Sequence, residues 1–561
     1  MKPSRNSYIA LLCATTVTAA ILASCGGSSN PAATTASSIA SNACQGQESW
    51  PNRALTAADA SKVDPQQFIS EAQLKAWAIE TDAQGLRATG NLAHDAYIDR
   101  LAARLRCAGV QDVHFEDVPV TRWEAKKWSL NVPGATPASS IRVASYAPYS
   151  GTTPASGVNA PLTFLSANTE ATTANAKGKI VVFEIEESSI PLAGFLLYTM
   201  GIYKPESFPV TKQYNRPFLY LLGAMVSRLE QLEAAGAAGG IAILPVAYET
   251  AFGTYAPYDG KLLHTPTLFV DRDEGGRLKQ LAAANKTATL TLQAQIDKVN
   301  SRNIIGYIPG ASDELTVINS HTDGTNYIED NGPDAVVGIA QYYARLPKEQ
   351  LPRSMMVLLS AGHFTGGSAI KQFLKNHEED GLVDRIASVV TIEHLGAEEY
   401  EPDEKGVLQP TGEPELGAFF MPEHQALADA AFDMFKNADV GFGAVLKPTD
   451  PTSTGENGSN APAWPGEGQY FYQIARIPTA NYITGPYYLL NWGVNTVEKT
   501  NFTRMRKLMT SFAQMQIDLS KKSKESLRTS SIAVITAGNT GLPLPALPPS
   551  PIGPIKLPVG I

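Results

Sequence analysis

The sequence predicts an α/β fold in which a mixed sheet is flanked by helices and interrupted by an inserted β-rich domain. Between residues 301 and about 520, β-branched segments alternate with helical patterns, which favours a sheet covered by helices on both faces. Between residues 121 and 300 the pattern changes to short β segments and loops rich in Gly, Ala, Pro and Ser. At 561 residues, the chain is also too long for one ordinary core.

Composition excludes few classes of protein. The chain is 43% hydrophobic and 18% charged, as globular proteins usually are. Its net charge is −9 and it has no stripe of Lys or Arg, which argues against nucleic acid as a partner. The oligomeric state cannot be read from these features.

Residues 1–24 have the pattern of a lipoprotein signal peptide. Lys2 and Arg5 precede an apolar segment, residues 9–23, that is too short to span a bilayer comfortably. The sequence Leu22-Ala23-Ser24-Cys25 resembles a bacterial lipobox, which predicts cleavage before Cys25 and lipidation of its thiol. We therefore expect a lipoprotein anchored to a membrane of a bacterial cell envelope. The alternative is a plain secretory signal with a chance cysteine.

The segment after the signal, residues 25–65, is expected to be a flexible tether because its first part is rich in Ser, Ala, Thr and Gly. Two of the four cysteines, Cys44 and Cys107, remain once Cys13 leaves with the signal and Cys25 is lipidated. They could form a disulfide in an oxidising compartment, or stay as two free buried thiols.

The expected elements follow in order. The first part of the main domain, residues 66–120, reads as helices over 66–106 and a strand over 113–120. Within the β-rich domain, residues 190–226 form an apolar, aromatic insertion, which could be a lid, a membrane-facing hairpin or buried packing. Further strands are predicted at 303–308, 315–318, 354–359 and 386–392, with helices at 335–346 and 366–376. The catalytic part would span 301–525, and the Pro-rich tail, 526–561, has no core pattern.

A histidine and an aspartate lie two residues apart directly after the predicted strand 315–318. Residues i and i+2 of a strand point to the same face, so His321 and Asp323 are expected to share a pocket at its end. Imidazole is a common metal ligand, and a neighbouring carboxylate can ligate or fix the ring tautomer. The alternative is a hydrogen-bonded core histidine followed by a turn.

Three further polar segments follow strands or precede helices: Glu329-Asp330-Asn331-Gly332, Gly362-His363 and Glu393-His394. Strand ends gather at one edge of such a sheet, so a divalent-metal site is chemically reasonable. Zinc accepts nitrogen and oxygen ligands and activates water. Each segment also has another explanation: Asp330 could belong to a turn, and His394 would point away from Glu393 in a strand and belong to the core.

Several motifs resemble known families. Lys177-Gly178-Lys179-Ile180-Val181, Ala234 to Ile243 and His264 to Val270 resemble the protease-associated (PA) domain. Gly85 to Asn91 with His94, Asn303 to Gly310 and the H-x-D motif resemble the aminopeptidase Y and glutamate carboxypeptidase-like zinc peptidases. The resemblance covers about residues 66–520, and the motifs H-T-D-G, E-D-N-G, G-H-F and E-H-L-G-A are similar to those of a divergent subgroup.

The resemblance implies roles for particular residues. His321 matches a metal-binding histidine, Asp323 the aspartate that orients it, and Glu393 a later acidic ligand. Asp330 or Asn331 matches the bridging aspartate, with Asp334 a weaker candidate.

The chain departs from the family at two positions. Gly362-His363-Phe364 stands where a Glu-Glu pair is expected, and no histidine follows His424. A single metal on His321, Asp330 and Glu393, with His363 as base or fourth ligand, is therefore expected instead of two. Tyr487 could supply a proton-donating hydroxyl.

The resemblance implies an exported, lipid-anchored hydrolase that cleaves a peptide or small amide with one zinc ion. Two alternatives stay open at this point. One is a catalytically lapsed binding protein that keeps the fold, and the other is a relative with different single-metal chemistry, such as glutaminyl cyclisation.

Overall fold

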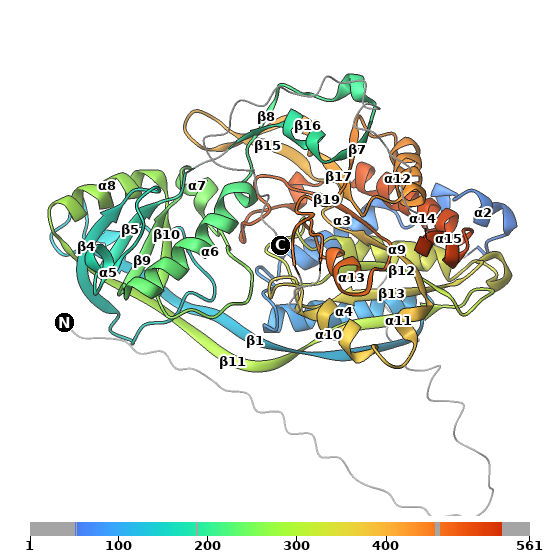
Figure 1. The fold of residues 1–561 in the computed structure, drawn as a ribbon, viewed down its shortest axis with the longest axis horizontal. Helices are drawn as coiled ribbons and strands as arrows, with labels where there is room; N and C mark the ends of the chain where they lie inside the picture. Colours follow the sequence, from blue (N-terminus) through green and yellow to red (C-terminus); the bar gives the residue numbers. More distant parts are fainter. Residues whose placement is uncertain (1–50, 52, 187–188, 455–459, 530–561) are drawn as a thin grey trace, which may run out of the picture. The chain divides into compact units, whose positions relative to one another are not determined.

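The structure is a computed structural model that describes residues 51, 53–186, 189–454 and 460–529 (Figure 1). The predicted signal peptide, the predicted lipidation site Cys25, the predicted disulfide cysteine Cys44 and residues 530–561 lie outside the described residues.

The main sheet is mixed, as predicted. Its order is β1 (Gln111–Asn131), β11 (Thr287–Ile308), β13 (Ser354–Ser360), β12 (Leu315–His321), β14 (Ile386–Ile392), β19 (Thr479–Thr484), β17 (Gly417–Phe420), β18 (Gly443–Leu446) and β7 (Thr199–Tyr203). Strand β12 runs parallel to both β13 and β14, and β14 runs parallel to β19. The carboxyl ends of these four central strands therefore meet at one edge of the sheet.

Helices cover both faces of this sheet. The helices of the main domain are α2 (Ala57–Ser61), α3 (Glu71–Asp82), α4 (Leu92–Cys107), α9 (Gly332–Tyr343), α10 (Ser368–Asn376), α11 (Leu382–Arg385), α12 (Gln425–Ala438), α13 (Gln469–Ala475), α14 (Phe502–Ser520) and α15 (Lys524–Thr529). Ile318 of β12 packs in the cluster formed with α3, α4, α9, α12 and α14, whereas its neighbour Val317 packs with α10 and α13. Successive strand residues point to opposite faces, so the side chains of a buried β-branched strand pack against the helices on both faces of the sheet.

The region between residues 121 and 300 contains its own layered unit. Strands β4 (Val158–Leu165), β5 (Ile180–Glu184), β9 (Gly239–Ile243) and β10 (Thr267–Val270) are parallel, and β3 (Ser145–Tyr146) pairs antiparallel with β10. The helices are α5 (Thr173–Ala176), α6 (Pro217–Ala235), α7 (Tyr248–Ala251) and α8 (Arg272–Ala283). Short strand pairs complete the chain: β2 (Ser140–Ile141) on β1, β6 (Ile190–Pro191) with β8 (Gln213–Tyr214), and β15 (Glu398–Pro402) with β16 (Leu408–Pro414). The region is more helical than the sequence suggested, because α6 alone has 19 residues.

The two predicted boundaries of this region fall inside strands. Strands β1 and β11 pair antiparallel from Gln111 opposite Tyr307 to Asn131 opposite Thr289, and form the long ribbon visible in Figure 1. Residues 120–121 and 300–301 lie in the middle of that ribbon. No loop separates the inserted region from the main domain at these points.

The apolar insertion, residues 190–226, is packed against the main sheet. Strand β7 extends the sheet edge by pairing with β18, and Phe195 and Phe208 join a buried cluster with residues of β17 and β18. Among the described residues, no helix is long and apolar enough to cross a membrane. The pairing of β7 and the burial of Phe195 and Phe208 favour the buried-packing interpretation of this insertion.

Both ends of the main domain are more ordered than the sequence suggested. Residues 53–65 were expected to belong to the tether, but Leu55 is 2% exposed and its amide donates to the Arg345 carbonyl. At the other end, residues 526–529 were expected to belong to the tail, but they lie in α15 and Leu527 is fully buried. Apolar side chains at these positions dock on the core and fix the backbone around them. Cys107 at the end of α4 is disulfide-bonded.

Candidate metal centre

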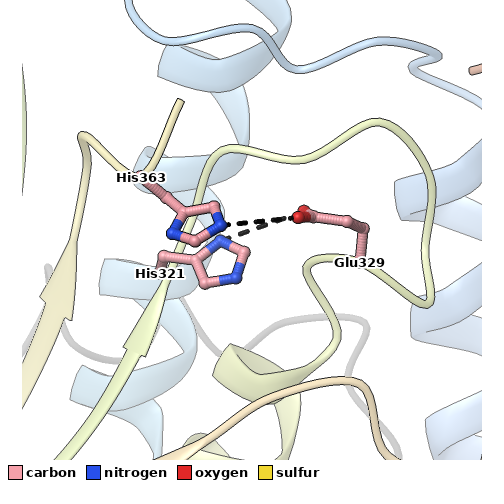
Figure 2. Close-up of side chains that lie close together, drawn as sticks. All are labelled: His321, Glu329 and His363. Carbon is pink, nitrogen blue, oxygen red and sulfur yellow. Dashed lines mark ion pairs between the residues drawn. The ribbon is translucent and has the colours of Figure 1, made fainter. Parts of the chain in front are cut away.

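Three histidines and two glutamates gather at the carboxyl edge of the central strands. His321 ends β12, His363 follows β13, and Glu393 and His394 follow β14. Glu329 lies in the loop that precedes α9. Each side chain is at most 2% exposed. The ring centroids of His321 and His363 are 4.1 Å apart. Figure 2 shows the two rings lying one over the other and Glu329 pointing toward both.

The polar atoms of these residues lie close to one another without touching. Nε2 of His321 is 3.9 Å from Oε2 of Glu393, and Nε2 of His363 is 3.8 Å from Oε1 of Glu329. Nε2 of His394 is 4.0 Å from the same Oε1. These separations exceed hydrogen-bond length, so the groups face a common space rather than pairing with each other.

Backbone carbonyls fix the tautomers of two of the histidines. Nδ1 of His321 lies 2.8 Å from the Asp323 carbonyl oxygen, and Nδ1 of His394 lies 2.5 Å from that of Thr484. A carbonyl can only accept, so each Nδ1 carries the hydrogen and each Nε2 presents a lone pair to the cluster. Burial lowers the pKa of His394 to about 3 and that of His321 well below its ordinary value, which keeps both rings neutral.

Several of these buried atoms have no hydrogen-bond partner in the described structure. They are Nε2 of His321 and His394, both oxygens of Glu329, Oε2 of Glu393 and Oε1 of Glu467. Buried polar atoms are nearly always paired, because leaving one unpaired costs about 1–3 kcal/mol. Neutral imidazole nitrogens and carboxylate oxygens are the donors that zinc prefers, so the residues present fit a zinc ion.

Glu467, which precedes α13, completes the cluster. Its Oε2 accepts from Nδ1 of His363 at 3.1 Å, and its main-chain amide donates to Oε1 of Glu393 at 2.8 Å. Burial alone would lower the pKa of His363, but the bond to Glu467 and the charges of Glu329 and Glu393 raise it to about 10. These contacts favour the imidazolium form of His363 in the metal-free chain. Burial raises the pKa of Glu393 to about 7.

Asp323 positions the imidazoles of His321 and His363, but its own carboxylate does not face the unpartnered nitrogen and oxygen atoms of the cluster. Its carboxylate accepts from Oγ1 of Thr89 at 2.5 Å and from the amides of His363 and Phe364 at 3.1 and 2.9 Å. The orienting contact with His321 comes from its main-chain carbonyl, since its carboxylate is 4.0 Å from Nδ1.

An apolar pocket lies beside this cluster. His363 and His394 form part of its wall, together with Tyr258, Phe218, Phe420 and Leu489. These two histidines of the cluster thus border a space lined mostly by hydrophobic side chains, as ligand sites usually are.

Comparison with known proteins identifies the fold. No protein-family model matches the sequence, and no curated protein matches it significantly. Among solved structures, a zinc aminopeptidase from Bacillus subtilis is similar with a TM-score of 0.54 and 15% identity, over 80% of this chain and 94% of that one. A peptidase M28 precursor from Shewanella amazonensis gives a TM-score of 0.54 and 15% identity, over 86% and 96%. This chain has the zinc-peptidase fold.

Within this zinc-peptidase fold, Asp330 does not face the cluster. Its carboxylate forms a buried, bidentate ion pair with Arg87, Nε to Oδ2 at 2.5 Å and Nη2 to Oδ1 at 2.8 Å. The side chain that points at His321 and His363 is that of the preceding residue, Glu329. The acidic side chain of this loop that faces the cluster is therefore one residue earlier than expected, because the turn before α9 sets a register that periodicity does not reveal.

The two other candidates in this loop are also engaged elsewhere. Asn331 exchanges two hydrogen bonds of 2.8 Å with the main chain of Leu395, and Asp334 pairs with Arg104 at 2.7 Å. The loop is held rigidly, since a Cβ on Gly332 would lie 2.1 Å from the Ile392 carbonyl oxygen.

His394 enters the cluster although strand alternation would turn it away. Strand β14 ends at Ile392, and the backbone of His394 is left-handed, with φ of +57°. The change of backbone conformation brings its side chain to the same side as Glu393. Alternation cannot predict this, because it holds only while the strand continues.

Tyr487 is 1% exposed and packs in the apolar cluster of the 121–300 region, and its role as a proton donor stays a prediction. Tyr258 instead lines the pocket, with its ring centroid 5.6 Å from that of His363 and its buried hydroxyl without a hydrogen-bond partner in the described structure. Burial, with the charges of Glu329 and Glu393, raises its pKa well above the ordinary value, so the hydroxyl keeps its proton. No sequence pattern singled out Tyr258 or Glu467, since both lie in loops outside the H-x-D and strand-end motifs.

Proposed function

We propose that this chain is a zinc-dependent hydrolase of peptide or amide bonds. The observation that carries the proposal is the set of buried imidazole and carboxylate atoms that face one space without partners. His321, His394, Glu329 and Glu393 would hold one zinc ion. Bound zinc would supply a Lewis acid that polarises a carbonyl group and acidifies water.

The chain's own residues contribute the remaining chemistry. His363 holds a proton on Nε2, kept there by Glu467 at Nδ1, and can deliver it to a leaving amine. Tyr258 presents a protonated hydroxyl to the same space and can donate a hydrogen bond to a developing oxyanion. Asp323 holds the His363 loop in place through the two amide contacts.

We further propose that the protein is exported and acts at the bacterial cell envelope. Support comes from the sequence alone: the signal-like residues 1–24 and the lipobox before Cys25. Lipid on Cys25 would anchor the folded domain to a membrane. The proposed PA-like region, residues 121–300, contributes Tyr258 to the pocket wall.

The proposal is tested by amide hydrolysis with purified mature protein. Zinc-loaded protein is expected to cleave members of a peptide and amino-acid amide panel, and a chelator to stop cleavage reversibly. His321→Ala should lower kcat/KM at least about a hundredfold, because a lost ligand weakens metal binding. His264→Ala, at a side chain that is 83% exposed, is the matched control and should keep wild-type activity.

Full activity of His321→Ala, or of the metal-free protein, would contradict the proposal. Peptides with N-terminal glutamine belong in the same panel. Cyclisation of these peptides with release of ammonia, and no hydrolysis of the others, would assign different chemistry to the same site.

A further inference from the structure

A row of buried polar side chains crosses the central strands. Asn319 of β12 lies opposite Thr391 of β14, which in turn lies opposite Asn481 of β19. All three residues are fully buried, and Oγ1 of Thr391 donates to Oδ1 of Asn319 at 3.0 Å. The row ends at Asn481, because its partner on β17 is Phe420. Burying a polar group costs free energy unless it is hydrogen-bonded, so Asn481 needs partners of its own.

The side-chain amide of Asn481 has two such partners. Its Nδ2 donates to Oε1 of Glu393 at 3.1 Å, and its Oδ1 accepts from the main-chain amide of Gly468 at 2.9 Å. A main-chain N–H can only donate, which fixes the orientation of the side-chain amide. Asn481 therefore joins a proposed zinc ligand to the segment that carries Glu467.

The segment around Glu467 fits closely against Asn481. A Cβ on Gly466 would lie 2.5 Å from Oδ1 of Asn481, and a Cβ on Gly468 would lie 3.0 Å from the same atom. The φ of Gly466 is +105°, a conformation that glycine adopts at little cost. The two glycines thus allow a close approach that fixes the main chain on both sides of Glu467. In this position, Oε2 of Glu467 accepts from Nδ1 of His363 at 3.1 Å.

The same contacts give the two oxygens of Glu393 different surroundings. Oε1 accepts from Nδ2 of Asn481 and, at 2.8 Å, from the main-chain amide of Glu467. Oε2 has no hydrogen-bond partner in the described structure and lies 3.9 Å from Nε2 of His321. A carboxylate that binds a metal is oriented by the hydrogen bonds that it accepts. Without Nδ2 of Asn481, Oε1 would keep one donor and the carboxylate would be freer to rotate.

We propose that Asn481 is a positioning residue of the metal centre. It turns Oε2 of Glu393 toward the space that this oxygen shares with His321, and it holds Glu467 against His363. Asn481 acts through the Glu393 carboxylate and through the main chain beside Glu467. The part of this inference that concerns zinc rests on the proposed function, whereas the part that concerns the main chain does not.

The first measurement is hydrogen–deuterium exchange of the metal-free, full-length mature protein, read by mass spectrometry of peptides that cover residues 466–469. In Asn481→Ala the Gly468 amide loses its acceptor. Exchange in these peptides should therefore be at least about tenfold faster than in wild type, as the loss of one buried hydrogen bond implies.

Asn319→Ala is the matched control. Asn319 is the same residue type in the same row and is equally buried, but its side chain bonds to Thr391 and to the Leu358 carbonyl. This variant should lower the melting temperature about as much as Asn481→Ala does. Exchange at residues 466–469 should nevertheless stay within about threefold of wild type, because the Asn481 contacts remain.

A second variant separates the two contacts of Asn481. Asn481→Asp keeps an oxygen for the Gly468 amide and loses the N–H that Glu393 accepts. Exchange at residues 466–469 should therefore stay within about threefold of wild type. This variant tests the main-chain contact even if Asn481→Ala does not fold.

The second measurement is zinc affinity, determined by competition with a chromophoric chelator. Asn481→Ala should weaken zinc binding about ten- to a hundredfold, whereas Asn319→Ala should stay within about threefold of wild type. In a Glu393→Ala background, Asn481→Ala should change the affinity by less than about threefold, because the carboxylate through which it acts is gone.

Unchanged exchange at residues 466–469 in Asn481→Ala, or fast exchange in Asn481→Asp, would overturn the role of Asn481 in holding Glu467. Equal zinc affinity of wild type and Asn481→Ala would overturn its role in orienting Glu393. A wild-type protein that binds no zinc would refute the proposed function and the zinc part of this inference. Exchange of the metal-free protein would then still decide whether Asn481 holds Glu467.

Discussion

In the candidate centre, the hydrogen bond at Nδ1 of each histidine determines the protonation of that ring. His321 and His394 donate from Nδ1 to carbonyl oxygens, so their Nε2 atoms are free to ligate. His363 donates from Nδ1 to the Glu467 carboxylate and becomes a cation. Three histidines at one sheet edge thus suit different proposed roles, because the Nδ1 partner of each ring differs.

Tyr258 allows a test of catalysis that leaves the fold intact. Tyr258→Phe removes only a hydroxyl that has no hydrogen-bond partner in the described structure, so the melting temperature should not fall. If the hydroxyl stabilises an oxyanion, kcat should drop about a hundredfold or more with zinc content unchanged. Tyr487→Phe is the comparison variant and should keep kcat. Wild-type kcat in Tyr258→Phe would remove this residue from the mechanism.

Part of the site could be predicted residue by residue. The strand and the i, i+2 spacing pointed to His321, and the end of a buried strand pointed to Glu393, and both lie in the cluster. Glu329, which also lies there, was not singled out, since loop geometry sets which of two adjacent acids points inward. Glu467 lies in a loop with no periodic pattern, so only the folded chain brings it to His363.

At the scale of elements, a buried ion network holds the insertion to the sheet. Arg216, just before α6, contacts Glu399, Glu401 and Glu415, which belong to or adjoin β15 and β17. The planar guanidinium of arginine has five N–H donors, which allows it to bind several carboxylates at once. The network positions Tyr214 and the start of α6 against the pocket.

Arg216→Met should lower the free energy of unfolding by about 3–5 kcal/mol, because it leaves the buried carboxylates without a cation. The check is chemical unfolding of variant and wild type under identical conditions. Lys261→Met removes a surface ion pair with Glu230 and should leave the unfolding midpoint unchanged. An Arg216→Met protein as stable as wild type would show that the network does not hold the insertion.

A second ion network links α10 to β1 and gives stability a dependence on pH. His377 places Nε2 2.6 Å from Glu116 and Nδ1 2.5 Å from Asp380. Burial opposes its charge, but the two carboxylates prevail and raise its pKa above the ordinary 6.5. The raised pKa means that this stabilisation is complete below pH 6.5 and is lost as the pH rises through the folded-state pKa.

His377→Gln should therefore lower the thermal midpoint at about pH 5.5 and have a smaller effect at about pH 9.5. The expected loss of stability at the lower pH is at most about 1 kcal/mol, since the pair is partly open to solvent. Calorimetric scans of both proteins at the two pH values check this. An equal or larger effect at the higher pH would contradict the assigned charge.

The central strands and their flanking helices were predictable because buried β-branched segments and amphipathic patterns are local signals. The borders of the inserted region were not, since β1 and β11 continue through them as one ribbon. Strand length depends on a partner that lies more than 150 residues away in the chain, and no local pattern encodes it.

At the scale of the whole molecule, the proposed zinc donors come from three separate segments: the end of β12, the loop before α9 and the residues directly after β14. They meet only when the main sheet is complete. Zinc would then bind the folded chain and not the unfolded one, so metal binding and folding should be coupled.

The most direct test of the account is the zinc content of the purified mature protein. Elemental analysis of wild type should give about one zinc ion per chain, and the midpoint of thermal unfolding should fall when a chelator removes it. The double variant Glu329→Gln, His394→Ala should contain no zinc, whereas Asp330→Asn should keep it, because Asp330 pairs with Arg87. A wild-type chain free of metal after zinc loading, or zinc retained by the double variant, would contradict the central claim.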